Sequence, residues 1–327
     1  MTEFGTKAEL ELTVVLAVVS GGRAVKENLS ALVPQIDFEH AEVIVPYDRW
    51  SLDVGDLVAQ FPDVTFHFIE DLGVAASPDI SAHQHRLYDR RRAIGLRHSR
   101  GRIIAMTEDH ALPAGDWVQQ VLAAHEQAYA VIGGAVQNAV DAPLNRAWYY
   151  CDFGRYGLPL EPGEATYVTD VNLAYKREAL AAVQEVWTEA YHETAVHSAL
   201  NSRGEKLFLD GRMVVFQNRP RMPVVRAIGE RMEWGRVFSE TRSKDLGLWR
   251  RLAFAAGTPL LPLVLLGRVF RHMRRQRQTV SSLISTLPVA LLLLCSWSWG
   301  EFVGYLAGEP TSEHEAWTTS FSGGDLL

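Results

Sequence analysis

Apolar residues in the first part of the chain form short β-branched runs that alternate with helical patterns. Leu12–Val19 is such a run, and after residues 20–22 (Ser-Gly-Gly) apolar residues recur with helical spacing at Val25, Leu29 and Leu32. This pattern predicts a strand, a loop and a helix. The unit then recurs, with strands predicted at Ala41–Val45, Val64–Ile69, Ile103–Met106 and Ala130–Ile132 and helices at Leu52–Phe61, Arg86–His98 and Trp117–Ala128.

Strands that alternate with helices require crossover connections. They predict an α/β fold of the Rossmann-like type, with a mostly parallel sheet and helices on both of its faces. Ligands of such sheets bind beyond the carboxyl ends of the strands, so we expect the functional residues directly after them. The predicted α/β domain covers residues 1–225.

After Arg226 the pattern changes to charged residues and tryptophans, and then to two uncharged runs. Leu252–Gly267 has 16 residues, fewer than the roughly 20 that cross a bilayer, and its two prolines would kink a helix. Val280–Gly300 has 21 uncharged residues and can span, and Trp297 and Trp299 suit a membrane interface. The predicted segments are a basic amphipathic connector (226–250), a membrane-associated helical hairpin (251–306) and a flexible tail (307–327).

An arginine-rich loop separates the two apolar runs. If both runs crossed the bilayer, this loop would lie on the side opposite the α/β domain, against the positive-inside tendency. We therefore favour a first segment that dips into the membrane or lies in its interface. A hairpin that crosses twice and a buried hairpin of a soluble protein are the alternatives.

The charge of the chain is divided unevenly. Residues 219–277 contain 14 Lys and Arg against four acids, a net charge of +10, and the rest of the chain carries −17. A basic block of this kind predicts an anionic partner. Because apolar runs interrupt it, phospholipid headgroups fit better than nucleic acid, and we expect no nucleic-acid partner.

The cysteines and the N-terminus bear on the compartment. Cys151 and Cys295 lie far apart, and the second sits within an apolar run, so the sequence indicates neither a disulfide framework nor a cysteine metal site. The first 13 residues are acidic and lack the basic and then apolar layout of a secretory signal. We expect a membrane protein whose α/β domain faces the cytoplasm.

Two carboxylates and an imidazole follow the predicted strand at Ile103–Met106. Glu108, Asp109 and His110 stand at its carboxyl end, where a ligand site is expected. Carboxylate oxygens with one imidazole suit Mg²⁺ or, somewhat better, Mn²⁺, which can bridge the phosphates of a nucleoside diphosphate. The alternative is a solvated loop that caps a helix.

Five stretches together resemble a family-two glycosyltransferase with the GT-A fold, over roughly residues 12–218. In that family an arginine-containing helix that ends in a glycine precedes a strand and an Asp-x-Asp type motif. Here Arg92, Gly95 and Gly101 match the helix, while Glu108, Asp109 and His110 occupy the motif. Glu, His and Ala93 depart from the usual residues. The stretches are VVLAVVSGG, EVIVPYD, RRAIGLRHSRGRIIAMTEDH, VTDVNLAYKREAL and YHETAVHSALNSRGEKLFLD.

The resemblance implies contacts to a nucleotide-sugar donor. Asp48, after the second strand, would accept a hydrogen bond from a uracil or guanine base, and Tyr47 could stack on the ring. Asp170 and Asn172 would contact the sugar and the diphosphate. A turn aspartate is the alternative for Asp48.

The resemblance also implies a general base. Glu193 stands eleven residues before Gly204, where the family has the aspartate that deprotonates the acceptor hydroxyl, and His192 replaces the first acid of that pair. A carboxylate on the acceptor side serves a single displacement with inversion. His197, one turn farther along the same helix, could orient Glu193.

Arg236 belongs to a Trp-Gly-Arg stretch that resembles one following the catalytic domain of these enzymes. It could reach a diphosphate or lie among lipid headgroups.

The sequence thus predicts an inverting, metal-dependent glycosyltransferase. It would move a sugar from a UDP- or GDP-linked donor to a lipid-linked glycan or an envelope polysaccharide near the membrane. The alternatives are a nucleotidyltransferase and a membrane-anchored, nucleotide-sugar-binding scaffold on a degenerate transferase fold. A Gln-x-x-Arg-Trp motif of processive enzymes has no match at residues 217–220, which favours single additions.

Overall fold

The computed structural model describes residues 4, 8–71, 80–243 and 246–308, with the backbone alone for 80–86 and 241. The chain folds as two compact units. The first comprises residues 1–76, 84–137 and 160–218, and the second comprises 77–83, 138–159 and 219–327.

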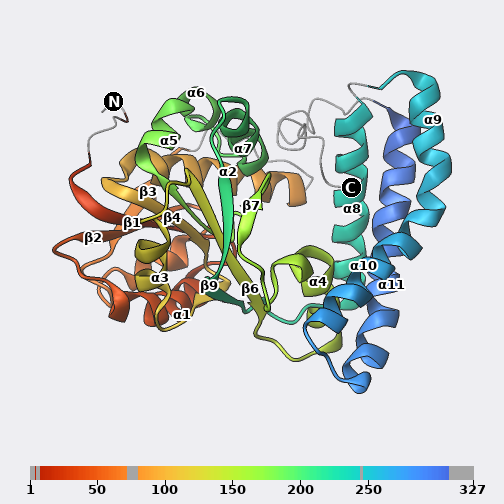
Figure 1. Ribbon diagram of the computed structural model, residues 1–327, viewed down its shortest axis with the longest axis horizontal. Coiled ribbons are helices and arrows are strands. Elements are labelled where there is room, and N and C mark those ends of the chain that lie inside the picture. Colours follow the sequence, from red (N-terminus) through yellow and green to blue (C-terminus); the bar gives the residue numbers. More distant parts are fainter. Residues whose placement is uncertain (1–3, 5–7, 72–79, 244–245, 309–327) are drawn as a thin grey trace. The chain divides into compact units, whose positions relative to one another are not determined.

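A nine-stranded sheet forms the centre of the first unit, in the order β3-β2-β1-β4-β8-β6-β9-β5, with β7 paired to β9 (Figure 1). The strands are β1 (Leu10–Ala17), β2 (Ala41–Asp48), β3 (Thr65–Ile69), β4 (Gly101–Glu108), β5 (Ala111–Pro113), β6 (Val131–Asn138), β7 (Gly163–Ala165), β8 (Asn172–Lys176) and β9 (Leu207–Gln217).

The α/β class is confirmed, and the sheet is mixed. Strands β3, β2, β1 and β4 are parallel, as the crossover pattern predicts. From β4 onward β8 pairs antiparallel with β4 and β6, and β9 pairs antiparallel with β5 and β7. The expectation of a mostly parallel sheet therefore holds for one half only, because β8 and β9 were not recognised as strands from the sequence.

Helices cover both faces of the sheet, as expected. One face is packed by α2 (Ile80–His98), α5 (Arg177–Ala182), α6 (Gln184–Trp187) and α7 (Glu193–Ser202), which share a buried core with β1, β4, β6 and β8. The other face carries α1 (Gly22–Leu32) and α3 (Trp117–Ala124) (Figure 1). The two faces of β4 are therefore shielded from water, and its carboxyl end is left for a site.

The predicted helix at Leu52–Phe61 is replaced by a short 3₁₀ helix, η2 (Leu52–Leu57). Gly55 within it has low helix propensity, and an added Cβ there would lie 3.2 Å from the Tyr47 hydroxyl. A second 3₁₀ turn, η1 (Val33–Gln35), follows α1.

The second unit is helical. It contains α4 (Pro143–Asp152), η3 (Gly154–Tyr156), α8 (Val224–Ser243), α9 (Leu248–Gly257), η4 (Thr258–Leu260), α10 (Leu261–Arg275) and α11 (Val280–Ala307). Within the described residues Leu248–Arg275 and Val280–Ala307 are long and apolar enough to cross a membrane. The predicted kink appears as η4, and the predicted tail lies outside the described residues from 309 onward.

Candidate active site

Asp109 holds the loop between β1 and α1 through hydrogen bonds to its backbone. Its Oδ2 accepts hydrogen bonds from the backbone N–H groups of Val19, Ser20 and Gly21, at 3.0, 2.7 and 3.2 Å. The side chain is buried, and its Oδ1 accepts no hydrogen bond from the described residues. Burial raises the pKa of Asp109, against the lowering effects of His110 and the three N–H groups. Asp109 therefore fixes the loop and retains one buried oxygen that could serve a ligand.

His110 lies beside that oxygen. Its Nε2 is 2.8 Å from Ser20 Oγ, and its Nδ1 is 3.8 Å from Asp109 Oδ1. When Nε2 carries the ring proton and donates it to Ser20, Nδ1 keeps its lone pair. Metal-binding histidines have this arrangement, with one ring nitrogen held by a partner and the other directed at the ion. Asp109 and His110 thus fit as two ligands of one cation.

Arg92 holds carboxylates from three parts of the fold. Its Nη2 lies 2.6 Å from Glu108 Oε1 and 2.7 Å from Asp170 Oδ2, and its Nη1 lies 3.5 Å from Asp89 Oδ1. The Arg92 side chain is 5% exposed, whereas those of Glu108 and Asp170 are each 15% exposed. Burial opposes the charge of Arg92, but Asp170, Glu108 and Asp89 outweigh burial and raise its pKa. The guanidinium is therefore a fixed cation among acids that reach solvent.

The acids around Arg92 outnumber the positive charges. Burial and the charge of Asp170 raise the pKa of Glu108 to about 8, although Arg92 acts in the opposite direction. The same two causes raise the pKa of Glu193 to about 7. Glu193 also raises the pKa of Glu108, so the two acid positions, 85 residues apart in sequence, belong to one electrostatic cluster. Carboxyl groups that titrate near neutral pH are characteristic of catalytic and cation-binding sites.

Glu193 is the first residue of α7 and is held by a tyrosine. The Tyr167 hydroxyl donates a 2.7 Å hydrogen bond to Glu193 Oε1, which counteracts part of the effect of burial on the carboxyl pKa. His192, immediately before the helix, has its Nδ1 3.1 Å from Asp89 Oδ2. Burial disfavours the charged imidazole, but Asp89 raises its pKa overall. Through Asp89, His192 joins the group centred on Arg92.

His197 does not take the direct position that the sequence indicated. Its Nε2 lies 2.9 Å from the hydroxyl of Tyr175, which is in turn 2.7 Å from that of Tyr191. The ring is buried, and burial lowers its pKa to about 3. It meets the Tyr167 ring edge to face, with centroids 5.2 Å apart. His197 therefore supports Glu193 through Tyr167.

Asp48 is engaged by the protein itself. Its two oxygens receive Nε and Nη2 of Arg91 at 2.8 and 2.9 Å, and Oδ1 also accepts the Trp50 N–H. The residue is 2% exposed. Tyr47 is partly exposed, and its ring lies 5.3 Å from that of Phe68. The expected contacts of Tyr47 and Asp48 with a nucleotide base stay predictions, and of the two Tyr47 is the more accessible.

Asn172 connects three parts of the sheet unit. Its Nδ2 donates to the carbonyl oxygens of Ala135 and Met213 at 2.8 and 2.9 Å, and its Oδ1 accepts the Trp117 indole N–H at 2.9 Å. The side chain is fully buried. Its expected role at the donor sugar stays a prediction, and its contacts here are structural. Asp170, two residues earlier, is the member of the pair that reaches solvent.

Arg236 lies on α8 of the second unit. Its Nε donates to Glu240 Oε1 at 2.7 Å, one turn along the same helix. The predicted contact with a diphosphate stays a prediction.

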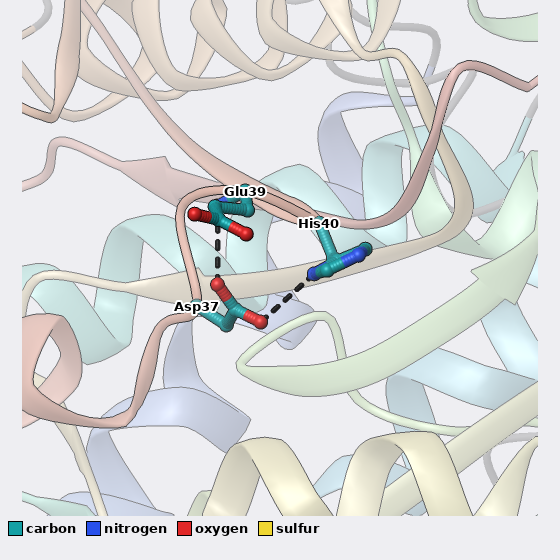
Figure 2. A group of neighbouring side chains, drawn as sticks. All are labelled: Asp37, Glu39 and His40. Atoms are coloured by element: carbon teal, nitrogen blue, oxygen red, sulfur yellow. Dashed lines mark hydrogen bonds and ion pairs between the residues drawn. The ribbon is translucent and has the colours of Figure 1, made fainter.

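A different group of side chains has the spacing of a three-residue cation site. Figure 2 shows Asp37, Glu39 and His40, the one such group among the described residues. All three are exposed, and His40 Nδ1 and the Glu39 N–H both bind the Asp37 carboxylate, at 2.9 and 3.1 Å. These bonds close a turn before β2, so we assign the group a local structural role. The possible ligand atoms of Glu108, Asp109 and His110 lie farther apart than those of this group, because the Glu108 carboxylate forms an ion pair with Arg92.

Sequence reasoning missed three residues that organise the site. Arg91 holds Asp48, Asp89 links Arg92 to His192, and Tyr167 holds Glu193. The i,i+3 spacing of Asp89 and Arg92 on a predicted helix was an available signal. Tyr167 and Glu193 are 26 residues apart, and no local pattern joins them.

No protein-family model matches the chain, and no curated protein matches it. Among solved structures, S. aureus TarS 1-349 in complex with UDP-GlcNAc is 11% identical, with a TM-score of 0.48 over 65% of this chain and 60% of that chain. This chain thus spans less than two thirds of that structure.

Two further structures show a similar degree of likeness. The mannosyltransferase PcManGT from Pyrobaculum calidifontis, in complex with GDP-Man and Mn²⁺, is 15% identical with a TM-score of 0.44 over 96% and 84% of the two chains. A mycobacterial protein is 15% identical with a TM-score of 0.44 over 68% and 72%. These likenesses are weak, and none of them assigns an activity to this chain.

Proposed function

We propose that this protein is a metal-dependent, inverting glycosyltransferase that moves a sugar from a UDP- or GDP-linked donor to an acceptor hydroxyl. The observation that carries the proposal is the carboxylate cluster around Arg92, which includes Glu108, Asp170 and Glu193. It lies where β4 ends, and carboxyl ends of strands are where α/β sheets bind ligands. The carboxylates of this cluster outnumber its fixed positive charge, so the cluster favours the binding of a divalent cation.

Glu193 is the proposed general base. A carboxyl group with a pKa of about 7 is half ionised near neutral pH, and it is basic enough to take a proton from a hydroxyl in the transition state. Tyr167 keeps Oε1 in a fixed orientation, so Oε2 is the oxygen that would receive the proton. His192 precedes the base in sequence, and Asp89 raises the pKa of its imidazole, which favours the protonated ring.

Asp109 and His110, with Glu108, are the proposed ligands of Mn²⁺ or Mg²⁺. When bound there, such an ion would supply the positive charge that stabilises the nucleoside diphosphate as a leaving group. Arg92 positions Glu108 and Asp170 at the cluster. Tyr47, Asp48, Asn172 and Arg236 complete the proposed donor-binding set.

We propose a lipid-linked glycan or an envelope polysaccharide as the acceptor, presented at the cytoplasmic side of a membrane. The support is the apolar C-terminal segment, which contains two candidate membrane helices. The chemistry at Glu193 itself requires only a hydroxyl.

The test is release of nucleoside diphosphate from a panel of UDP- and GDP-sugars with Mn²⁺, with Mg²⁺ and with a chelator. We expect release with one donor class, its loss with chelator, and a loss of at least 100-fold in Glu193→Gln, since general-base catalysis contributes roughly 10²–10⁴. Glu178→Gln, an exposed substitution of the same chemistry, is the matched control and should keep full activity.

The outcomes separate the alternatives. Metal-dependent donor binding without release, for every acceptor fraction supplied, would indicate a binding or scaffold protein. Equal release by wild type and Glu193→Gln would exclude Glu193 as the base. No nucleotide binding with any donor would overturn the proposal.

A further inference from the structure

The described part of the chain concentrates its exposed apolar side chains on the three C-terminal helices. Twelve of the 19 large apolar residues that are exposed lie on α9, η4, α10 and α11. On α11 they form one stripe, with Val280 71%, Ile284 70%, Leu292 42% and Trp299 56% exposed. The intervals between them are four, eight and seven residues, close to whole turns of an α-helix, so these residues lie on a single face. Exposed apolar residues gathered on one face of a helix mark an interaction surface.

The opposite face of α11 is packed against a charged helix. An added Cβ at Gly300 would lie 1.9 Å from the Met232 carbonyl oxygen, and one at Gly235 would lie 2.1 Å from that of Trp297. The backbones of α8 and α11 are therefore in direct contact through glycines. In the same region of α8, Arg236 pairs with Glu240, which is 1% exposed. An ion pair thus accompanies the last turns of α11.

A second charge reaches α11 near its start. Arg146 of α4 donates to Ser285 Oγ at 2.8 Å and to Thr286 Oγ1 at 3.0 Å. The 14 helical steps from Thr286 to Gly300 span about 21 Å at 1.5 Å per residue. The hydrocarbon core of a bilayer is about 30 Å thick. The part of α11 between its charged neighbours is too short to cross it.

We propose that α9, α10 and α11 form a monotopic anchor, which enters one leaflet of an anionic bilayer and does not cross it. The apolar stripe of α11 and exposed Leu263, Val264 and Phe270 of α10 would enter the leaflet. Arg271 and Arg274, exposed at the end of α10, would bind phosphate headgroups. The arginines that the sequence placed in a loop mostly belong to α10 (Leu261–Arg275). In a monotopic anchor they lie on the same side as the rest of the chain, which removes the conflict with the positive-inside tendency.

This proposal replaces a crossing by Val280–Gly300, which the sequence alone allowed. It concerns where the protein binds and does not depend on the transferase chemistry. Its tests measure location and lipid binding. The anchor can therefore be disproved while the protein still transfers sugar, and transferase activity can be absent while the anchor is confirmed.

Sidedness is the first test. In full-length protein with Cys295→Ala, a single cysteine is introduced by Arg274→Cys before α11, by Ala307→Cys at its end or, in the first unit, by Asp63→Cys, all at exposed positions. Cys151, which is partly exposed, is replaced by serine in every variant. A membrane-impermeant maleimide is added to right-side-out and to inverted vesicles from the expressing cells. A monotopic anchor predicts that all three cysteines react in the same vesicle type, whereas a crossing by α11 alone would place Ala307→Cys in the opposite type. Reaction in opposite types would overturn the proposal.

Lipid charge is the second test. Full-length protein is sedimented with phosphatidylcholine vesicles that contain or lack phosphatidylglycerol. We expect Arg274→Glu to weaken binding to the anionic vesicles roughly tenfold. Lys26→Glu, the same charge reversal at an exposed position of α1, should have no effect. A discrete dimer in detergent-free buffer whose vesicle binding ignores lipid charge would show instead that a second copy of the chain covers the stripe.

Discussion

The hydroxyl of Tyr167 donates a 2.7 Å hydrogen bond to Oε1 of Glu193, the residue proposed as the general base. This bond favours the ionised carboxylate and so lowers its pKa, while burial raises it. Tyr167→Phe removes only the hydroxyl. We expect the acid limb of the pH–rate profile to move up by about one unit, because a hydrogen bond to a charged group is worth roughly 1.5–3 kcal/mol.

The control for Tyr167→Phe is Tyr129→Phe, which removes a hydroxyl from a ring that stacks on Phe208. It should leave the profile in place. A uniform loss of rate in Tyr167→Phe, with no movement of the acid limb, would mean that Tyr167 serves packing alone.

Glu193 should also make stability depend on pH. Its pKa in the folded protein, about 7, is above its ordinary value of 4.5. Between these values the folded state binds more protons, so the contribution of Glu193 to the free energy of unfolding is present in acid and is lost as pH rises through 7. Glu193→Gln cannot ionise. Relative to wild type it should gain roughly 2 kcal/mol between pH 5 and pH 8.5, after allowance for partial exposure.

Urea unfolding at the two pH values measures this difference. Glu178→Gln, at an exposed position, should follow the wild-type dependence. An identical pH dependence for Glu193→Gln and wild type would place the titration elsewhere in the cluster.

Two histidines distinguish the candidate cation groups. His110 lies beside the buried Asp109 oxygen, and His40 belongs to the exposed turn that contains Asp37 and Glu39. His110→Ala should weaken Mn²⁺ binding at least tenfold, because it removes a ligand, while His40→Ala should have no effect. Calorimetric titration of Mn²⁺, alone and with UDP or GDP, provides the measurement. The reverse pattern would move the cation to the exposed turn.

The parallel half of the fold could be predicted because each of its strands is a short apolar run followed by a helical pattern. Strand β8 could not, since Asn172 and Lys176 bound a run of only three apolar residues, and its antiparallel pairing with β4 is a long-range contact. The prediction of an α-helix at Leu52–Phe61 was wrong because Gly55 and the packing of Tyr47 favour a 3₁₀ turn.

The same division holds for the site. Residues directly after a strand, such as Glu108 and Asp109, could be placed from local sequence. What each side chain binds could not. Asp109 and Asp48 are both strand-end aspartates, yet one retains a buried oxygen without a hydrogen bond from the described residues and the other is held by Arg91. Burial and partners decide that difference, and they arise only in the folded chain.

Asn172 allows a structural role to be separated from a role in donor binding. Asn172→Ala would remove the hydrogen bonds that the amide makes in the core to the Ala135 and Met213 carbonyls and to the Trp117 indole N–H. We expect a loss of roughly 2–4 kcal/mol in the free energy of unfolding, since each unsatisfied buried group costs about 1–3 kcal/mol and some relaxation occurs. Asn201→Ala, where an exposed amide makes one hydrogen bond to Thr166, should cost less than about 1 kcal/mol.

Trp117→Phe refines the test of Asn172. It removes one of the three hydrogen bonds and keeps the amide in place. Because Trp117 is fully buried, the smaller ring also leaves a cavity, so the two variants are compared by donor binding rather than by stability. If Asn172 serves the sheet alone, the folded fraction of each variant binds the nucleotide-sugar as wild type does. If Asn172→Ala instead unfolds at the wild-type urea concentration and binds the donor at least tenfold more weakly, the amide contacts the sugar, and the sheet must retain its order without it.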